Sequence, residues 1–141
     1  MKTQLDIEKI AACKQNDAEF LYTDGRYDGA YYLGGYTIEL LLKAKVCKTL
    51  GIDNFFEESW LKKLKYPQTF RNHDLEVLLI LSGLYPHFNK DSNTTPSLKQ
   101  SWSAICGWHE DARYLTGKTK TEADFLLTSI KEIATWIRKH L

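Results

Sequence analysis

Five polar residues recur on one side of an otherwise apolar stretch between residues 26 and 50. Their intervals of four, four, three and four residues match one face of an α-helix; they are Asp28, Tyr32, Tyr36, Glu39 and Lys43. A buried charge is costly unless it is paired, so this polar stripe needs a ligand, a second copy of the chain or partners within the fold. The alternative is an ordinary Glu39–Lys43 pair on an exposed strip, worth about 0.2–0.5 kcal/mol.

His73 lies in a short polar segment, residues 71–74, that leads into an expected helix. Because imidazole titrates near neutral pH, this side chain could bind a phosphate or move a proton. Polar side chains just ahead of a helix also commonly cap its free N–H groups. The segment therefore has a functional and a structural interpretation, and both stay open.

His109 and Arg113 are placed one turn apart on a helix expected over residues 96–115, with Trp108 and Tyr114 beside them. A guanidinium group matches the geometry of a phosphate, and an aromatic ring can stack on a base. The alternative is a set of contacts within the helix, with the tryptophans in the core. The residues alone favour neither.

The composition is that of one globular domain over residues 1–141, with 43% hydrophobic and 26% charged residues. A net charge of +1 provides no general attraction to nucleic acid. The three cysteines include no CxxC pair and fit neither a disulfide framework nor a zinc site, so we expect no metal and no cofactor. The charged N-terminal segment and the lack of an apolar run of about 18 residues predict a cytoplasmic protein without a membrane partner.

Helical patterns run through the chain. Thr3 and Asp6 predict the capped start of a helix that ends at the Asp24-Gly25 break. Residues 26–50 predict the most buried helix, ending at Gly51, and Gly34-Gly35 within it predict a close approach by a neighbouring helix or a ligand.

Further helices are expected over residues 55–66, 74–84, 96–115 and 121–141. The first of these is short and loosely packed, residues 92–97 form the longest polar loop, and Thr121 with Asp124 caps the last helix. Thr95 and Pro96 suit the start of the helix that follows the loop. The expected fold is all-α, an antiparallel up-and-down bundle of four to five main helices with a short extra helix.

The stretch from Tyr27 to Ala44, YDGAYYLGGYTIELLLKA, resembles a helix of the HEPN family, whose members read like A-x-Y-L-x-G-Y-x-x-E-x-x-L-K-A. His73-Asp74-Leu75, and Trp108 followed by Arg113-Tyr114, resemble later family elements in the same order. The resemblance implies a helical bundle, usually dimeric, found in prokaryotic toxin–antitoxin and defence systems. Some members pair with minimal nucleotidyltransferases, some bind nucleotides, and many are metal-independent ribonucleases.

The ribonuclease members of that family resemble R-x4-6-H, and this sequence departs from the motif. No histidine follows any of the four arginines at that distance; they are Arg26, Arg71, Arg113 and Arg138. His109 and Arg113 have a nearby spacing in reversed order, and reversal is not equivalent because transition-state stabilisation requires placed donors.

We therefore expect a noncatalytic or accessory HEPN module that binds a nucleotide, RNA or a nucleotidyltransferase partner. The expected ligand-binding residues are Tyr36, Glu39, Lys43, His73, Arg113 and Tyr114, with Lys43 and Arg113 on phosphate. A homodimer is also expected, because four tryptophans and eight tyrosines exceed what one small bundle readily hides. The alternatives are a divergent metal-independent endoribonuclease that uses Arg113 with His73 or His109, and a purely structural helical dimer.

Overall fold

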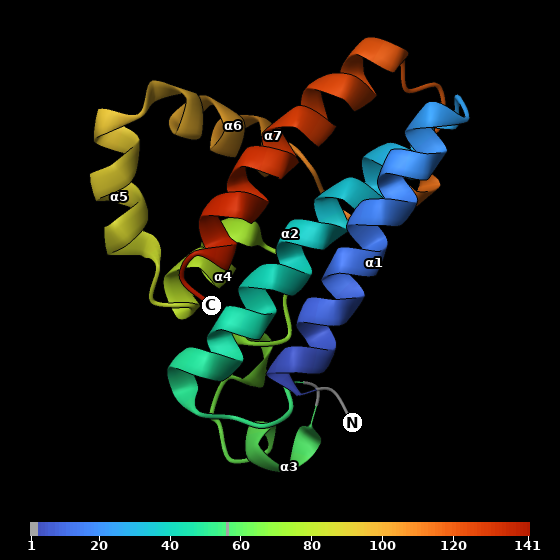
Figure 1. Cartoon of the computed structure of the whole chain (residues 1–141). Helices are drawn as coiled ribbons and strands as arrows, with labels where there is room; N and C mark the ends of the chain where they lie inside the picture. The colour runs from blue at the N-terminus through green and yellow to red at the C-terminus, as the bar shows by residue number, and fades with distance from the viewer. Residues whose placement is uncertain (1–2, 56) are drawn as a thin grey trace.

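The computed structural model describes residues 3–55 and 57–141, and every regular element within these ranges is helical (Figure 1). The all-α prediction is confirmed. None of the described helices is long and apolar enough to cross a membrane. The elements are α1 (Gln4–Thr23), α2 (Tyr27–Leu50), α3 (Glu58–Leu61), α4 (Leu75–Leu81), α5 (Tyr85–Thr94), α6 (Pro96–Cys106) and α7 (Lys120–Arg138), with 3₁₀ turns η1 (Pro67–Thr69) and η2 (Glu110–Tyr114).

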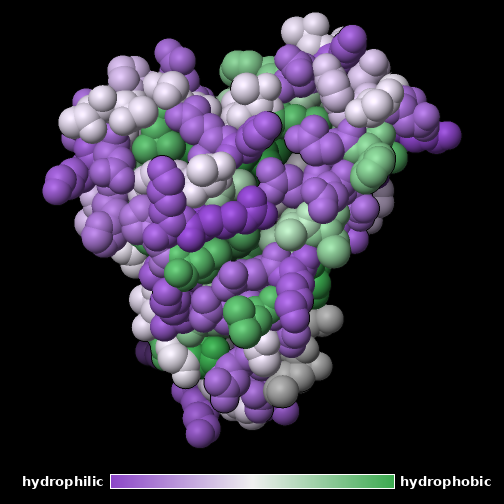
Figure 2. All heavy atoms as spheres, viewed as in Figure 1, coloured by the Kyte–Doolittle hydropathy of each residue, from purple (hydrophilic) through white to green (hydrophobic). Residues whose placement is uncertain are grey.

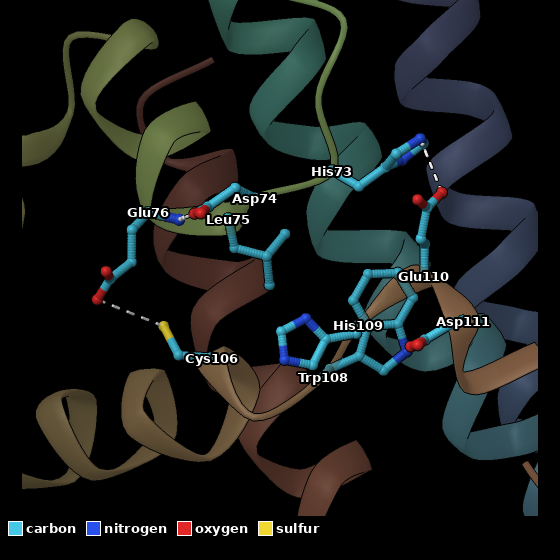
Figure 3. Close-up of a pocket in the computed structure, with 9 residues that line it drawn as sticks. All are labelled: His73, Asp74, Leu75, Glu76, Cys106, Trp108, His109, Glu110 and Asp111. Carbon is cyan, nitrogen blue, oxygen red and sulfur yellow. Dashed lines mark hydrogen bonds and ion pairs between the residues drawn. The ribbon is translucent and has the colours of Figure 1, made fainter. Parts of the chain in front are cut away.

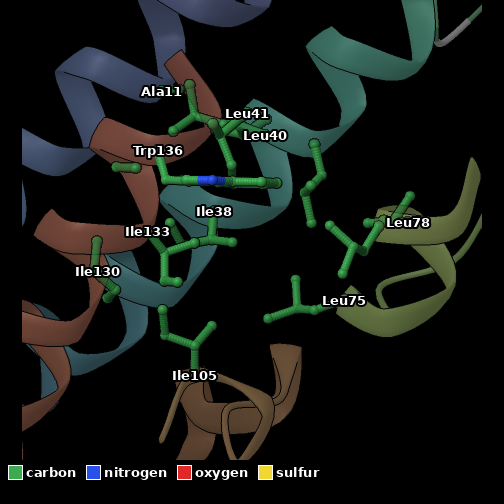
Figure 4. Packing of buried hydrophobic residues seen from close by; sticks show 14 of the residues in the cluster. Ala11, Ile38, Leu40, Leu41, Leu75, Leu78, Ile105, Ile130, Ile133 and Trp136 are labelled. Atoms are coloured by element: carbon green, nitrogen blue, oxygen red, sulfur yellow. The ribbon is translucent and has the colours of Figure 1, made fainter. Parts of the chain in front are cut away.

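Helix α2 lies at the centre of the fold, because its sequence is apolar on several sides. Helix α1 runs beside it, and α7 packs against another part of its surface, with α4 and η2 also in contact with α2 (Figure 1). Residues from these helices converge on one core, which includes Ile38, Leu41, Ile130 and Ile133 (Figure 4). The predicted most buried helix is confirmed. On the face shown in Figure 2, hydrophilic residues dominate and the hydrophobic ones form separate patches.

The glycine pair in α2 permits two close approaches. A Cβ atom at Gly34 would lie 2.8 Å from side-chain atoms of Leu127 and Ile130 in α7, and a Cβ at Gly35 would collide with the indole of Trp108. Each glycine costs a helix about 1 kcal/mol relative to alanine. That cost is offset here by packing that no larger residue allows, so the predicted close approach is confirmed.

The helix ends largely follow the predicted capping chemistry. Thr3 and Asp6 form a complete capping box at the start of α1, and α2 ends at Gly51 with a φ of 66°. Asp74 caps α4, since its carboxylate accepts the backbone N–H groups of Glu76 and Val77. The cap fixes the backbone directly after His73.

The prediction of a polar loop over residues 92–97 is wrong. Helix α5 extends through Thr94 and α6 starts at Pro96, so Thr95 alone separates them. Tertiary contacts hold this polar segment helical: Phe88 is buried against tryptophan rings, and Asp91 accepts a hydrogen bond of 2.8 Å from the indole of Trp136. Polar composition alone did not reveal these contacts.

Three predicted helix boundaries also need correction. The helix expected over residues 96–115 ends at Cys106, and the chain turns there so that Trp108 can pack against Gly35. Helix α7 begins at Lys120 because the hydroxyl of Thr119, and not that of Thr121, accepts the N–H of Glu122. Of the helix expected over residues 55–66, the described part contains the single turn α3.

Candidate functional site

A buried ion pair stands at the base of the candidate site. Glu39 has no exposed surface and Lys43 is 5% exposed, and the Lys43 ammonium lies 2.6 Å from Glu39 Oε1. The ammonium also lies 5.4 Å from the centre of the Phe55 ring. The interpretation of Glu39 and Lys43 as a pair on an exposed strip is therefore wrong, because α2 carries both groups inside the fold.

His73 connects this pair to the surface. Its Nδ1 lies 2.8 Å from Glu39 Oε1, and its Nε2 lies 2.8 Å from Glu110 Oε2 in η2. Both ring nitrogens of His73 therefore lie within hydrogen-bond distance of a carboxylate oxygen. Lys43, Glu39, His73 and Glu110 thus make one continuous chain of ionisable groups from α2 to η2, which we call the Lys43–Glu110 network.

One oxygen of the network has no partner among the described residues. Glu39 Oε2 is buried and accepts no hydrogen bond, whereas Oε1 serves both Lys43 and His73. A buried acceptor without a donor costs stability, so the carboxylate depends strongly on its two partners at Oε1. Removing Lys43 should leave an expensive buried charge.

An open cavity of about 450 Å³ lies beside the network, between the start of α4, the end of α6 and η2 (Figure 3). Four carboxylates and two histidines face it, and no lysine or arginine of the described residues lines it. The lining residues are His73, Asp74, Leu75, Glu76, Cys106, Trp108, His109, Glu110 and Asp111. The cavity is therefore a region of negative potential.

The thiol of Cys106 reflects that potential. Burial raises the pKa of Cys106 to about 12, with Glu76 and Asp74 adding to the increase. Its sulfur lies 4.0 Å from Glu76 Oε1 and can donate a weak hydrogen bond to it. A thiol with this pKa is protonated at neutral pH, which lowers the nucleophilicity of Cys106.

A stack of aromatic rings continues from Trp108, which lines the cavity, to two tyrosines of α2. Trp108 is 2% exposed, and Tyr32 stacks on it with ring centres 6.1 Å apart. Tyr36 continues the stack, 6.1 Å from Tyr32 and nearly parallel to it. Burial raises the pKa of Tyr36, with smaller contributions from Glu39 and Tyr32, so its phenol stays neutral. The indole N–H of Trp108 is buried and has no acceptor among the described residues.

Arg113 and Tyr114 lie on the exposed part of η2. The guanidinium of Arg113 is 4.8 Å from the centre of the Tyr114 ring, which is 74% exposed. Tyr114 is the main cause of a raised pKa at Arg113, and Tyr32 and Glu110 add to it. The guanidinium is thus a surface cation in the same turn as Glu110 and Asp111, which line the cavity.

The structure brings together most of the predicted site residues. Glu39, Lys43 and His73 join in the network, Tyr36 lies beside it, and Arg113 with Tyr114 occupies the turn that supplies Glu110. Their roles in ligand binding stay predictions. The stripe residue at the other end of α2, Asp28, is not part of this site: it accepts the N–H groups of Gly117 and Lys118 at 3.2 and 2.7 Å.

The helical pairing of His109 with Arg113 is wrong in its geometry. His109 is the extended residue that precedes η2, with φ −131° and ψ 155°, so the two residues do not share an α-helical turn. Glu110 was not predicted as the partner of His73. These residues are far apart in the chain and belong to different elements, so no local pattern pairs them.

No family model, curated protein or solved structure matches this chain. Within residues 3–55 and 57–141, no group of three His, Cys, Asp or Glu side chains is placed to hold a metal ion.

Proposed function

We propose that this chain is a noncatalytic module of the HEPN type, an up-and-down bundle that binds a nucleotide or single-stranded RNA at η2 and the adjoining cavity. The observation that carries the proposal is an exposed guanidinium beside an exposed aromatic ring, Arg113 and Tyr114, in the same 3₁₀ turn that supplies Glu110 and Asp111 to an open cavity. A guanidinium matches phosphate oxygens, and an aromatic ring stacks on a base.

The charge distribution assigns different roles to the two cations of the predicted site. The cavity is lined by carboxylates and disfavours phosphate, so the phosphate lies outside it, against Arg113. Lys43 is buried and ion-paired, and with Glu39 it positions His73 and thereby η2. In this proposal Lys43 does not contact the phosphate directly, as was expected from the sequence, and contributes to binding only by holding His73 and η2 in place.

The contacts of the two His73 ring nitrogens support RNA binding over RNA cleavage. An acid–base residue in RNA cleavage needs a ring nitrogen within reach of the substrate, and both nitrogens of His73 already lie against carboxylates. The enzymatic alternative is a metal-independent endoribonuclease built on His109 and Arg113, because His109 is exposed and lines the cavity.

The family resemblance extends the proposal to a homodimer in a toxin–antitoxin or defence context, with a minimal nucleotidyltransferase as a further partner. Exposed apolar side chains support an interface: Leu5 is 65%, Phe20 77% and Phe125 62% exposed. Light scattering at tens of micromolar protein checks the dimer. A monomer mass there would remove it.

The binding proposal is tested by titrating fluorescein-labelled single-stranded RNA and nucleoside monophosphates with the full chain. We expect Arg113→Ala to weaken binding by about 1–3 kcal/mol, the range of hydrogen bonds to charged groups. Arg138→Ala is the matched control, because Arg138 is exposed at the end of α7. Absence of binding by the wild type, or unchanged affinity in Arg113→Ala, would contradict the proposal.

The enzymatic alternative is tested in the same preparation with a metal chelator present. We expect no cleavage of single-stranded RNA above background. Cleavage that disappears in both Arg113→Ala and His109→Ala would replace the binding module with the ribonuclease.

A further inference from the structure

Positive charge is concentrated in one segment of this nearly neutral chain, residues 62–71 between α3 and α4 (Figure 1). The segment reads KKLKYPQTFR and contains three lysines, one arginine and no acidic residue. Because these four belong to 19 basic residues in all, the rest of the chain has 15 basic and 18 acidic residues. We call residues 62–71 the basic segment. It can attract a polyanion although the whole chain has a net charge of only +1.

The three lysines of the basic segment face solvent. Lys62, Lys63 and Lys65 are all exposed, and none of them forms an ion pair in the part of the chain that the structure describes. By contrast, Lys118 lies 3.3 Å from a carboxylate oxygen of Glu122. An exposed ammonium group without a carboxylate partner is available to a phosphate group.

An exposed aromatic ring lies among these lysines. Tyr66 is 65% exposed, and the ammonium of Lys65 lies 5.4 Å from the centre of its ring. The same arrangement occurs at η2, where Arg113 is 4.8 Å from the ring centre of Tyr114. Among the described residues, Tyr66 and Tyr114 are the two most exposed tyrosines. A cation beside an exposed ring can bind a backbone phosphate while the ring stacks on a neighbouring base.

Packing at both ends holds the basic segment in place. Trp60, just before it, meets Phe70 edge to face with ring centres 5.3 Å apart. The indole N–H of Trp60 donates to the backbone oxygen of Asn54 at 3.1 Å, and Leu61 is 3% exposed. These contacts close the segment into a loop with its lysines on the outside. A ligand that binds there therefore requires less ordering of the chain.

The basic segment leads directly to the proposed binding site. His73 follows Arg71 by two positions, and its Nε2 lies 2.8 Å from Glu110 Oε2 in η2, the turn that contains Arg113 and Tyr114. Each exposed ring can stack on one base. The two regions together therefore fit a strand of several nucleotides, and a mononucleotide cannot occupy both.

The chemistry of the basic segment favours a single strand over other polyanions. A duplex keeps its bases stacked on one another and offers no free base to Tyr66. A membrane surface binds a long amphipathic helix, whereas α3 and η1 contain four and three residues. An acidic peptide would use the lysines and leave the ring without a role.

We propose that the basic segment is a second contact surface for single-stranded RNA, in which Lys62, Lys63 and Lys65 bind backbone phosphates and Tyr66 stacks on a base. This inference rests on the proposed function for its ligand. It names that ligand as a strand of several nucleotides that contacts both η2 and the basic segment.

The test compares two triple variants with the same net charge in binding to a fluorescein-labelled single-stranded RNA of roughly ten nucleotides. The first variant removes the exposed lysines of the basic segment, with Lys62→Gln, Lys63→Gln and Lys65→Gln. The control removes three exposed lysines from α5, α6 and α7, with Lys90→Gln, Lys99→Gln and Lys131→Gln. The first variant should lower the slope of log affinity against log salt by about 2, since each phosphate contact on a single strand contributes about 0.7. The control should leave the slope nearly unchanged.

A second pair of variants tests the aromatic contact. Tyr66→Ala should weaken binding of the same RNA roughly fivefold or more, which corresponds to the stacking of one base on an aromatic ring. Tyr85→Ala is the matched control, because Tyr85 is the third exposed tyrosine of the described residues. It should leave the affinity nearly unchanged. Melting temperatures from circular dichroism check that all variants are folded.

The outcomes separate this inference from the proposed function. Wild-type affinity in the variant without the three segment lysines would overturn the inference, and the proposed function would stand if Arg113→Ala still weakened binding. A loss in that lysine variant with wild-type affinity in Arg113→Ala would support the basic segment and contradict the proposed function. Equal losses in the two triple variants would show that affinity follows net charge and would overturn the inference. Equal competition by duplex RNA, polyglutamate or phosphatidylserine vesicles would also overturn it.

Discussion

Two charged regions of this protein contain similar groups in opposite surroundings. On α2, Lys43 is buried against Glu39, whereas on η2 the guanidinium of Arg113 is exposed against an aromatic ring. From the sequence, both cations were expected to bind phosphate. The degree of burial therefore decides what each cation can do. A buried cation such as Lys43 is held by the carboxylate that it neutralises, whereas an exposed cation such as Arg113 is available to a ligand.

The largest effect is expected from breaking the buried pair. Lys43→Ala leaves the Glu39 carboxylate, which already has one unsatisfied oxygen, without its closest cation and should destabilise folding by about 3–5 kcal/mol. Lys48→Ala is the control on the same helix, because Lys48 is exposed, and should change stability by less than about 0.5 kcal/mol. Chemical denaturation measures both.

A double variant sharpens this result. Replacing both charges, Glu39→Met with Lys43→Met, removes the buried carboxylate together with its partner and should cost less than the sum of the single changes. Additive losses would mean that the two groups do not stabilise each other and would contradict the network.

A smaller effect is expected at the link between the two regions. His73→Ala removes the contacts of the imidazole to Glu39 and Glu110 and should lower the free energy of unfolding by about 1–3 kcal/mol, towards the lower value because the side chain is 46% exposed. It should also weaken nucleotide binding, because η2 loses its connection to α2. His87→Ala, exposed on α5, is the control. Binding that is unaffected by His73→Ala would remove its positioning role.

In the exposed region on η2, Arg113→Ala should weaken RNA binding and leave the free energy of unfolding nearly unchanged. Its loss should flatten the dependence of RNA affinity on salt by about one charge, because one phosphate contact disappears. Affinities measured at several salt concentrations check this slope. An unchanged slope would place the phosphate on a different cation.

The smallest effect concerns the electrostatics of the cavity. With its pKa raised to about 12 by burial and by Glu76 and Asp74, Cys106 should react with iodoacetamide at pH 8 at least about tenfold more slowly than the exposed Cys13. Raising the pH towards the pKa of Cys106 should speed its reaction, because only the thiolate reacts. Glu76→Gln removes one of the causes of the shift and should also speed it. Equal rates for the two thiols at pH 8 would contradict a negative cavity.

Parts of the fold could be predicted from local sequence patterns. The apolar run of α2, its glycine pair and its terminal Gly51 predicted a central helix with a close neighbour, because each of these signals acts within one element. The C-terminal end of α6 could not be predicted from local sequence. The helix ends at Cys106 where Trp108 packs against Gly35, and this packing is a tertiary contact.

The candidate site was predicted only in part for the same reason. Its stripe on α2 follows from helical spacing, but Glu110 and Asp111 come to the cavity from a 3₁₀ turn that the pattern assigned to a longer helix. The pairing of His73 with Glu110 depends on the arrangement of α4 and η2 against α2, and no periodicity in the sequence encodes that arrangement directly.

One paired measurement tests the division between the two regions most directly: the unfolding free energy and the single-stranded RNA affinity of Lys43→Ala and Arg113→Ala, taken in one buffer under conditions where both variants are folded. We predict that Lys43→Ala loses about 3–5 kcal/mol of stability, and that Arg113→Ala loses about 1–3 kcal/mol of binding with little change in stability. Wild-type RNA affinity in Arg113→Ala, or a large loss of stability in that variant without any loss of binding, would contradict the account.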